Sequence, residues 1–256
     1  MIKAAFFDLD GTLVSFKTHQ VSEGTIRAFD RMHALGIRTF LSTGRPVCVV
    51  PQLPLSFDGH VTMNGGYCFV GDKVLFKNPI PIDESNQWIR YAEQHNICTL
   101  IFTEHDMFVN PVKSAAADAV AREVNFPIPP VRTTQELLGM ECYQAIAVME
   151  RHEDQAVAQM LPHCRLPRWH DHFTDVINVN NSKAVGIQSI LDHFGLTPAE
   201  CIAFGDGEND LEMLQYCGIG VAMGNSRDAV KAHADYVTTT VDDEGVLNAL
   251  QSLSII

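Results

Sequence analysis

The N-terminal part of the chain alternates between short apolar runs and apolar residues at helical spacing. The run at residues 2–7 predicts a buried strand that ends at Asp8. The next apolar positions recur every three or four residues and predict a helix that Ser22 caps and Gly36 closes. Further strands are predicted at 37–41 and within 60–77, a segment that contains a hairpin turned at Gly71-Asp72.

The pattern changes after Pro81, which predicts a linker. Residues 82–178 mix short strands and helices without regular alternation, which predicts a small α+β domain inserted in the chain. Asp83 is expected to cap the first helix of this domain. Strands are predicted at 98–102, 107–109, 142–148, 164–169 and 174–179, and helices at 114–123 and 154–161. The aromatic residues expected in its core are Trp88, Trp169 and Phe173.

Regular alternation of strands and helices returns in the last part of the chain. A helix is predicted at 182–194 and is stopped by Gly195, and Thr197-Pro198 opens the next helical turn. The remaining strands are predicted at 201–204, 220–222 and 236–237, and the remaining helices at 209–216, 226–232 and 244–253. This order predicts an α/β fold: a Rossmann-like parallel sheet, covered by helices on both faces, over residues 1–81 and 179–256.

Composition narrows the class of protein. The 256 residues are 46% hydrophobic and 19% charged, which suits one large domain or two modest ones. The formal net charge is −13, and the sequence contains no run of Lys or Arg. This balance argues against nucleic acid or an anionic membrane surface as a partner. A small anionic substrate is compatible with it, because a metal ion and a few cations can reverse the field inside a cleft.

Cysteine usage and the N-terminus bear on location. The seven cysteines are scattered and never spaced as CxxC, which favours buried reduced thiols over disulfides or a zinc site. The chain opens directly on a strand-like run without the pattern of a signal peptide. No apolar stretch approaches the length that spans a bilayer. A cytoplasmic protein is therefore expected.

Polar residues follow three of the predicted parallel strands. These strand ends carry Asp8-x-Asp10, Ser42-Thr43 and Asp206. Ligands of parallel α/β sheets bind beyond the carboxyl ends of the strands, so the three groups are expected to converge at one edge. Two crowded carboxylates repel each other unless a cation or a shared proton relieves them. Magnesium, which prefers oxygen ligands, is the expected cation.

Two further features support a phosphate site at this edge. Asp210 lies about one helical turn after Asp206, in a glycine-rich segment that alone reads equally well as a turn with a helix cap. Lys183 begins the helix that returns the chain to the sheet. A single lysine is usually a solvated surface charge. Its position close to the carboxylate edge favours a role in holding phosphate.

The sequences FFDLDGTL around Asp8, LSTGR around Thr43, Lys183 itself, and AFGDGENDLEML around Asp206 resemble the four motifs of the haloacid dehalogenase superfamily. MNGG and VAMGNS further resemble its Cof-type phosphatases, which carry a large α+β cap. The resemblance covers the predicted core at 1–81 and 179–256. In the predicted cap, 82–178, only length, position and element order match.

The resemblance implies roles for individual residues. Asp8 would form an aspartyl-phosphate, and Asp10 would protonate the leaving group and then activate water. Mg²⁺ would bind Asp8, the main-chain carbonyl of Asp10, and Asp206. The phosphoryl group would be held by Thr43 and Lys183, with Asn209 and Asp210 completing the surroundings. Three further residues are weaker candidates: Ser42 as an alternative hydroxyl, Arg45 as a contact to substrate or to an acidic neighbour, and Asn64 as a supporting hydrogen-bond partner.

Three functions are compatible with these residues. The favoured one is a phosphatase of small phosphorylated metabolites, with sugar phosphates as the best guess, acting as a monomer or small homo-oligomer. A phosphomutase or phosphotransferase would pass the phosphate of the same aspartyl-phosphate to a sugar and not to water. A non-catalytic phosphate sensor ranks last, because the nucleophile and the metal aspartate are both present.

Overall fold

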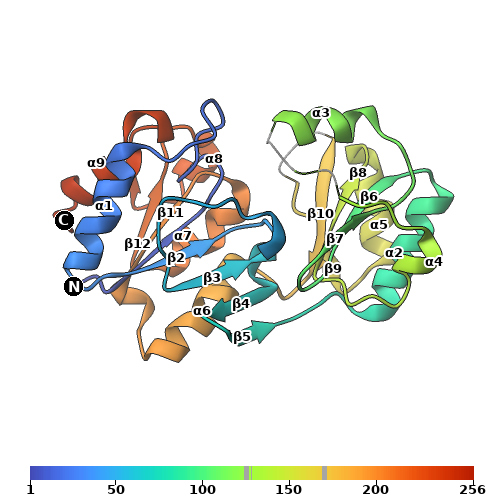
Figure 1. Ribbon diagram of the computed structural model, residues 1–256, viewed down its shortest axis with the longest axis horizontal. Coiled ribbons are helices and arrows are strands. Elements are labelled where there is room, and N and C mark those ends of the chain that lie inside the picture. Colours follow the sequence, from blue (N-terminus) through green and yellow to red (C-terminus); the bar gives the residue numbers. More distant parts are fainter. Residues whose placement is uncertain (124–126, 128, 169–171) are drawn as a thin grey trace. The chain divides into compact units, whose positions relative to one another are not determined.

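The computed structural model describes residues 1–123, 127, 129–168 and 172–256 (Figure 1). The chain packs into two units. The first comprises Met1–Gly44, Pro51–Phe76 and Ser182–Ile256, and the second comprises Arg45–Val50 and Lys77–Asn181. The short segment Arg45–Val50, which the sequence analysis assigns to the first domain, thus packs within the second unit.

The first unit is built on a sheet that, within the described residues, has eight strands in the order β13-β12-β11-β1-β2-β3-β4-β5. Neighbours from β13 to β3 run parallel, and β4 is antiparallel to β3. The strands are β1 (Ala4–Phe7), β2 (Arg38–Ser42), β3 (Gly59–Thr62), β4 (Tyr67–Val70), β5 (Lys73–Lys77), β11 (Cys201–Gly205), β12 (Ile219–Ala222) and β13 (Tyr236–Val237). The predicted α/β fold with a parallel sheet is confirmed.

The helices of this unit are α1 (Glu23–Ala34), α6 (Lys183–Phe194), α7 (Leu211–Tyr216), α8 (Asp228–Lys231) and α9 (Gly245–Ser252). They cover both faces of the sheet, and neighbouring residues of the central strand β1 point to opposite faces. Phe6 packs in a core cluster with residues of α6 and α7, whereas the ring of Phe7 lies 4.8 Å from that of Phe29 on α1. Figure 1 shows α1 and α9 side by side, and these two helices are in contact.

Helix ends in the first unit follow the capping residues that the sequence predicts. The Ser22 hydroxyl accepts a hydrogen bond from the Thr25 N–H at the start of α1. Gly195 ends α6 in the left-handed conformation, at φ 65°. Before β11, Pro198 begins a short 3₁₀ turn that Thr197 caps. Both ends of α6 are therefore fixed by local sequence, and its first residue is Lys183.

The second unit contains an antiparallel sheet that, among the described residues, has five strands in the order β7-β6-β8-β10-β9. These strands are β6 (Cys98–Phe102), β7 (Met107–Val109), β8 (Gln144–Val148), β9 (Cys164–Arg165) and β10 (Phe173–Asn178). The helices are α2 (Ile82–Gln94), α3 (Ala115–Glu123), α4 (Thr134–Leu137) and α5 (Asp154–Met160). Trp169, at the end of a predicted strand, lies outside the described residues.

One face of this second sheet packs against α2, α4 and α5. Its apolar cluster joins Trp88 of α2 and Val157 of α5 to Ile101 of β6, all at most 1% exposed. The Trp88 indole N–H donates to the Thr99 hydroxyl at 2.9 Å, so its polar atom is satisfied inside the core. The predicted core positions of Trp88 and Phe173 are confirmed, since Phe173 is 4% exposed.

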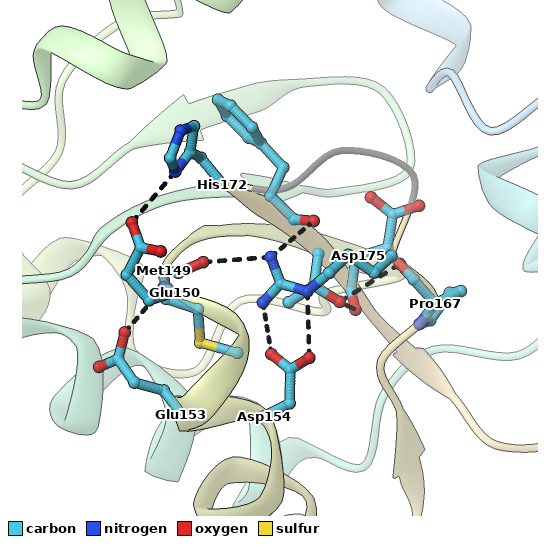
Figure 2. Close-up of polar contacts among 10 residues, drawn as sticks. Met149, Glu150, Glu153, Asp154, Pro167, His172 and Asp175 are labelled. Carbon is cyan, nitrogen blue, oxygen red and sulfur yellow. Dashed lines mark hydrogen bonds and ion pairs between the residues drawn. The ribbon is translucent and has the colours of Figure 1, made fainter.

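A polar cluster fixes the start of α5 in the second unit (Figure 2). The Arg168 guanidinium donates to both carboxylate oxygens of Asp154 and to the carbonyls of Met149 and Phe173. The Arg168 side chain is 5% exposed and that of Asp154 is 27% exposed, so a buried planar fork of donors meets a half-buried carboxylate and two carbonyls. Beside it, His172 Nδ1 contacts Glu150 at 3.0 Å. These contacts join the ends of β8 and β10 to α5.

Two local predictions for the second unit differ from the structure. Asp83 does not cap α2: Pro81 occupies the N-cap position, and Asp83 lies within the first turn. An acidic side chain is favourable there because it faces the positive end of the helix dipole. The short helix α4 was not predicted, although Thr133 and Glu136 form a capping box at its start.

Within the described residues, no helix is both long and apolar enough to cross a bilayer.

Candidate active site

Strand order brings the predicted strand ends together. β1 lies between β2 and β11 and is parallel to both. Asp8 follows β1, Thr43 follows β2, and Asp206 follows β11. Parallel strands end at the same edge of a sheet, so these residues share the edge where α/β proteins bind ligands.

A buried ion cluster occupies this edge. The Lys183 ammonium donates to Asp8 Oδ1 and to Asp210 Oδ1, each at 2.5 Å. The side chain of Lys183 is completely buried, and the whole residues Asp8 and Asp210 are 6% and 0% exposed. Ser182 caps α6 and so places Lys183 at the first position of that helix. The lysine is therefore an internal counter-ion and not a solvated surface charge.

Burial and the neighbouring charges shift the pKa values of this cluster. Burial raises the pKa of Asp8 well above its ordinary value, Lys183 opposes that rise, and the carboxylates of Asp210, Asp206 and Asp10 add to it. Burial also raises the pKa of Asp206 to about 7. Burial by itself would lower the pKa of Lys183, but Asp210 and Asp8 outweigh it and hold that pKa above its ordinary value. The site thus holds more negative charge than its lysine neutralises.

Asp210 fixes the loop that carries Asp206. Its second oxygen, Oδ2, accepts the backbone N–H of Asp206 at 3.0 Å and that of Gly207 at 2.9 Å. A Cβ at Gly205 would lie 2.5 Å from the Cβ of Asp210, so the loop approaches too closely for any other residue. Asp210 therefore serves the loop and the lysine at once, which accounts for its burial.

The donor set of the site fits a divalent metal. Carboxylate oxygens of Asp8, Asp206 and Asp210 lie within 4.8 Å of one another. Hard cations such as Mg²⁺ prefer this kind of oxygen ligand, and a cation would stabilise the ionised carboxylates against the burial and the mutual repulsion that raise their pKa values. The third ligand that the resemblance implies is the main-chain carbonyl of Asp10. Since Asp210 already bonds Lys183 and two backbone N–H groups, Asp8 and Asp206 are the side chains best suited to the metal.

The second strand end offers two hydroxyl groups in different settings. Thr43 is 1% exposed, and its backbone N–H donates to the Val61 carbonyl at 2.8 Å. Ser42, the last residue of β2, is 0% exposed, and its hydroxyl has no hydrogen-bond partner among the described residues. Thr43 lies beyond the strand and Ser42 lies within it. Of the two residues, Thr43 is therefore the one that lies past the strand end, beside the predicted ligand-binding edge.

Asn64 and Asn209 form a pair behind this edge. The Asn209 amide donates to Asn64 Oδ1 at 3.0 Å. Asn64 is 2% exposed and has a left-handed backbone, with φ 52°. Its backbone N–H donates to the Thr43 carbonyl at 3.2 Å, and a Cβ at Gly44 would lie 3.2 Å from its side-chain amide. Asn64 therefore connects the loop after β2 to the loop after β11.

Two further residues, Arg45 and Asn225, differ from what the sequence predicts for the site. Arg45 belongs to the second unit, where its guanidinium donates to the Val49 carbonyl at 3.4 Å. Asn225, which the sequence analysis did not single out, contacts the Asp206 carboxylate at 3.1 Å. Only its position in the VAMGNS segment, noted as a resemblance, offered a signal for it.

The family model of haloacid dehalogenase-like hydrolases matches residues 5–250. A Bacillus subtilis strain 168 protein provisionally named as the phosphatase YkrA is 31% identical, over 99% of this chain and 98% of its own length. A Streptococcus pyogenes serotype M6 protein, provisionally named as a bifunctional phosphatase and peptidyl-prolyl cis-trans isomerase, is 33% identical. The chain spans 54% of that protein's length.

A solved structure agrees with these relatives. It is described as a sugar phosphatase of subclass IIB of the haloacid dehalogenase superfamily. It has a TM-score of 0.93 and 36% sequence identity to this chain. The match covers 99% of this chain and 100% of the chain in that structure. The similarity therefore includes the second unit as well as the first.

Proposed function

The chain belongs to the haloacid dehalogenase-like hydrolases and is a phosphomonoesterase, and from this premise we propose that it hydrolyses small phosphorylated metabolites, above all sugar phosphates, with Mg²⁺ as cofactor. The observation that carries the proposal is the buried cluster of Asp8, Lys183 and Asp210 beside Asp206. A carboxylate held by an internal ammonium at the ligand-binding edge of a parallel sheet is suited to attack phosphorus.

In the first step a carboxylate oxygen of Asp8 attacks the phosphorus atom. A bond forms between this oxygen and phosphorus, and the bond from phosphorus to the ester oxygen breaks. Asp10 gives its proton to the departing alkoxide, which leaves as an alcohol. The product on the enzyme is an aspartyl-phosphate at Asp8.

In the second step a water molecule attacks the same phosphorus atom. Asp10, now ionised, takes a proton from this water, and the bond between phosphorus and the Asp8 oxygen breaks. Inorganic phosphate leaves, and both aspartates return to their starting state. Thr43 and Lys183 hold the phosphoryl oxygens during both steps, since positioning and charge stabilisation supply most of the catalysis in phosphoryl transfer.

Asp8, the main-chain carbonyl of Asp10, and Asp206 are the groups proposed to hold Mg²⁺. When bound, the metal supplies Lewis-acid stabilisation of the phosphoryl oxygens and offsets their repulsion from the nucleophile. The chain's own residues set the frame for it. Asp210 fixes the loop of Asp206, and Lys183 fixes one oxygen of Asp8.

Two observations bear on the substrate class and on the cellular compartment. The similarity to a sugar phosphatase over nearly the full chain supports sugar phosphates. All seven cysteines are free thiols, six of them buried, which supports a reducing compartment such as the cytoplasm. We further propose a monomer or small homo-oligomer without a nucleic-acid or membrane partner, in keeping with the net charge of −13.

The test is phosphate release from an aryl phosphate and from hexose phosphates, with Mg²⁺ and with EDTA. Asp8→Asn should lower turnover by on the order of 10³-fold or more while the circular dichroism spectrum stays native, because the substituted amide cannot act as the nucleophile. Asp192→Asn is a matched control on the exposed side of α6 and should keep full activity. Formation of isomerised hexose phosphate without release of free phosphate would instead indicate a phosphomutase. Turnover retained by Asp8→Asn would refute the assignment of Asp8 as the nucleophile.

A further inference from the structure

Asn225 lies in the loop after β12, and its side chain joins three distant segments of the first unit. Its Nδ2 donates to Asp206 Oδ2 at 3.1 Å and to the Gly11 carbonyl at 2.9 Å. Its Oδ1 accepts the backbone N–H of Val241 at 3.0 Å. A primary amide has two N–H donors and a carbonyl acceptor, so this environment uses both kinds of group that the side chain offers.

The Asp206 carboxylate also packs directly against the turn that follows Asp10. Gly11 has φ +82°, and a Cβ at this position would lie 2.3 Å from Asp206 Oδ2. Only glycine fits this approach. The same oxygen that accepts from Asn225 is therefore enclosed by the Gly11 backbone, which leaves the carboxylate little rotational freedom.

The turn that holds Asn225 is itself anchored. The Ser15 hydroxyl donates to Asp242 Oδ1 at 2.6 Å, next to Val241. On the other side, the Asn248 amide on α9 donates to the Asp243 carbonyl at 2.8 Å and to the Thr239 hydroxyl at 2.9 Å. The acceptor end of Asn225 thus rests on a turn that α9 and the loop after β1 support.

We propose that Asn225 is a positioning residue that fixes the orientation of the Asp206 carboxylate for the divalent cation. Groups that hydrogen-bond metal ligands orient them and change metal affinity, typically by 10–100-fold when removed. The inference rests on the proposed metal role of Asp206 and adds to it a residue that has no contact with substrate in the mechanism above.

The test measures binding of MgCl₂ and of CaCl₂ to the purified full chain by isothermal titration calorimetry, without substrate. Asn225→Ala should weaken Mg²⁺ binding by on the order of 10-fold. Ca²⁺ binding should weaken less, because Mg²⁺ demands near-octahedral geometry and Ca²⁺ tolerates flexible geometry. In turnover assays the variant should need more Mg²⁺ for half-maximal rate and regain most of its rate at saturating Mg²⁺.

Asn248→Ala is the matched control, because it removes an amide that bonds the same turn from α9 and has no hydrogen bond to Asp206. It should bind both cations as the native chain does. Equal Mg²⁺ affinity of the native chain and Asn225→Ala, or an equal loss in Asn248→Ala, would overturn the positioning role. So would the same loss for Mg²⁺ and Ca²⁺. A native chain that binds no Mg²⁺ would instead contradict the proposed metal site itself.

Thermal unfolding of both variants in EDTA shows whether each variant is folded at the temperature of the cation titrations. Asn225→Ala loses three hydrogen bonds, one of them to the turn, and Asn248→Ala loses two hydrogen bonds to the turn. Should Asn225→Ala unfold at the working temperature, Asn225→Ser provides a smaller change that keeps a hydroxyl at the position, and the same ratio of Mg²⁺ to Ca²⁺ affinity decides the outcome.

Discussion

At the scale of single residues, the Lys183 ammonium links the stability of the first unit to the chemistry of its site. It is buried between Asp8 and Asp210, and both contacts are 2.5 Å long. Such an arrangement need not stabilise a fold relative to apolar residues, because desolvation of the charges opposes their attraction. Removal of one member is different, since the other charges then stay buried without a partner.

Lys183→Met should therefore destabilise the metal-free chain strongly. The expected loss in free energy of unfolding is about 3–5 kcal/mol, the cost of breaking a buried ion pair from one side. Urea unfolding followed by circular dichroism, in EDTA, measures it. Added Mg²⁺ should restore part of the loss, because the cation neutralises the carboxylates that the lysine leaves behind.

The matched control is Lys17→Met, which removes a lysine that pairs with Asp242 at 2.6 Å on the surface. The Lys17 side chain is 79% exposed, so its removal should leave the unfolding midpoint unchanged within error. Equal effects of the two substitutions would contradict the internal counter-ion role of Lys183.

At the scale of elements, a strained turn holds the start of α6. Met63, Asn64 and Gly65 follow β3 and all have positive φ, at 49°, 52° and 87°. Left-handed backbone is costly for residues other than glycine, and such strain persists only where surrounding contacts enforce it. A Cβ at Gly65 would lie 1.9 Å from the Ser182 carbonyl, the N-cap of α6. The turn is therefore pressed against the residue that precedes Lys183.

Gly65→Ala should disturb both the fold and the site. The new methyl group must displace the Ser182 backbone, and with it the first residue of α6. The loss of stability should exceed that of Gly71→Ala, a substitution at φ +53° where nothing lies within 4 Å of the added atom. Gly71→Ala should cost about 1 kcal/mol from backbone strain alone. Denaturant unfolding of both variants, with phosphatase assays at matched folded fraction, measures the difference. Equal losses would contradict the close contact.

Elements with local signals could be predicted from sequence, and those without them could not. The Ser22 cap of α1 and the Gly195 end of α6 follow from residues next to each helix. The prediction that Asp83 caps α2 was wrong, because an aspartate near a helix start suits both the N-cap position and the first turn. The start of α4 carries a capping box that could have been found, but a helix of one turn has no apolar period to reveal it.

Site residues divide along the same line. The positions of Asp8, Thr43 and Asp206 follow from strand ends in a parallel sheet, which alternation along the chain predicts. Asn225 could not be predicted, because its partners Gly11 and Val241 lie 214 and 16 positions away in sequence. Such contacts depend on how loops meet in three dimensions, and no period in the sequence encodes that.

At the scale of the whole molecule, the aspartates of the site add negative charge to a protein that is already acidic. The chain has a formal net charge of −13, and its proposed metal site gathers several aspartates. Burial raises the pKa of Asp206 from an ordinary value of 3.8 to about 7. A carboxyl group with a raised pKa binds its proton more tightly in the folded state than in the unfolded state. Folding stability therefore depends on pH and on the cation together.

The sign of this dependence is specific. Between about pH 4 and pH 7 the folded chain keeps the Asp206 proton while the unfolded chain releases it, so stability contributed by this group falls as pH rises. In EDTA, the thermal unfolding midpoint of the native chain should drop across this window more steeply than that of Asp206→Asn, which lacks the titrating group.

At pH 8, Mg²⁺ should raise the native midpoint, because the cation binds the ionised site of the folded state only. It should leave Asp206→Asn nearly unchanged. Parallel pH curves for the two chains in EDTA would show that the raised pKa of Asp206 does not govern stability in this range. A Mg²⁺ shift of equal size in both would show that the cation binds elsewhere.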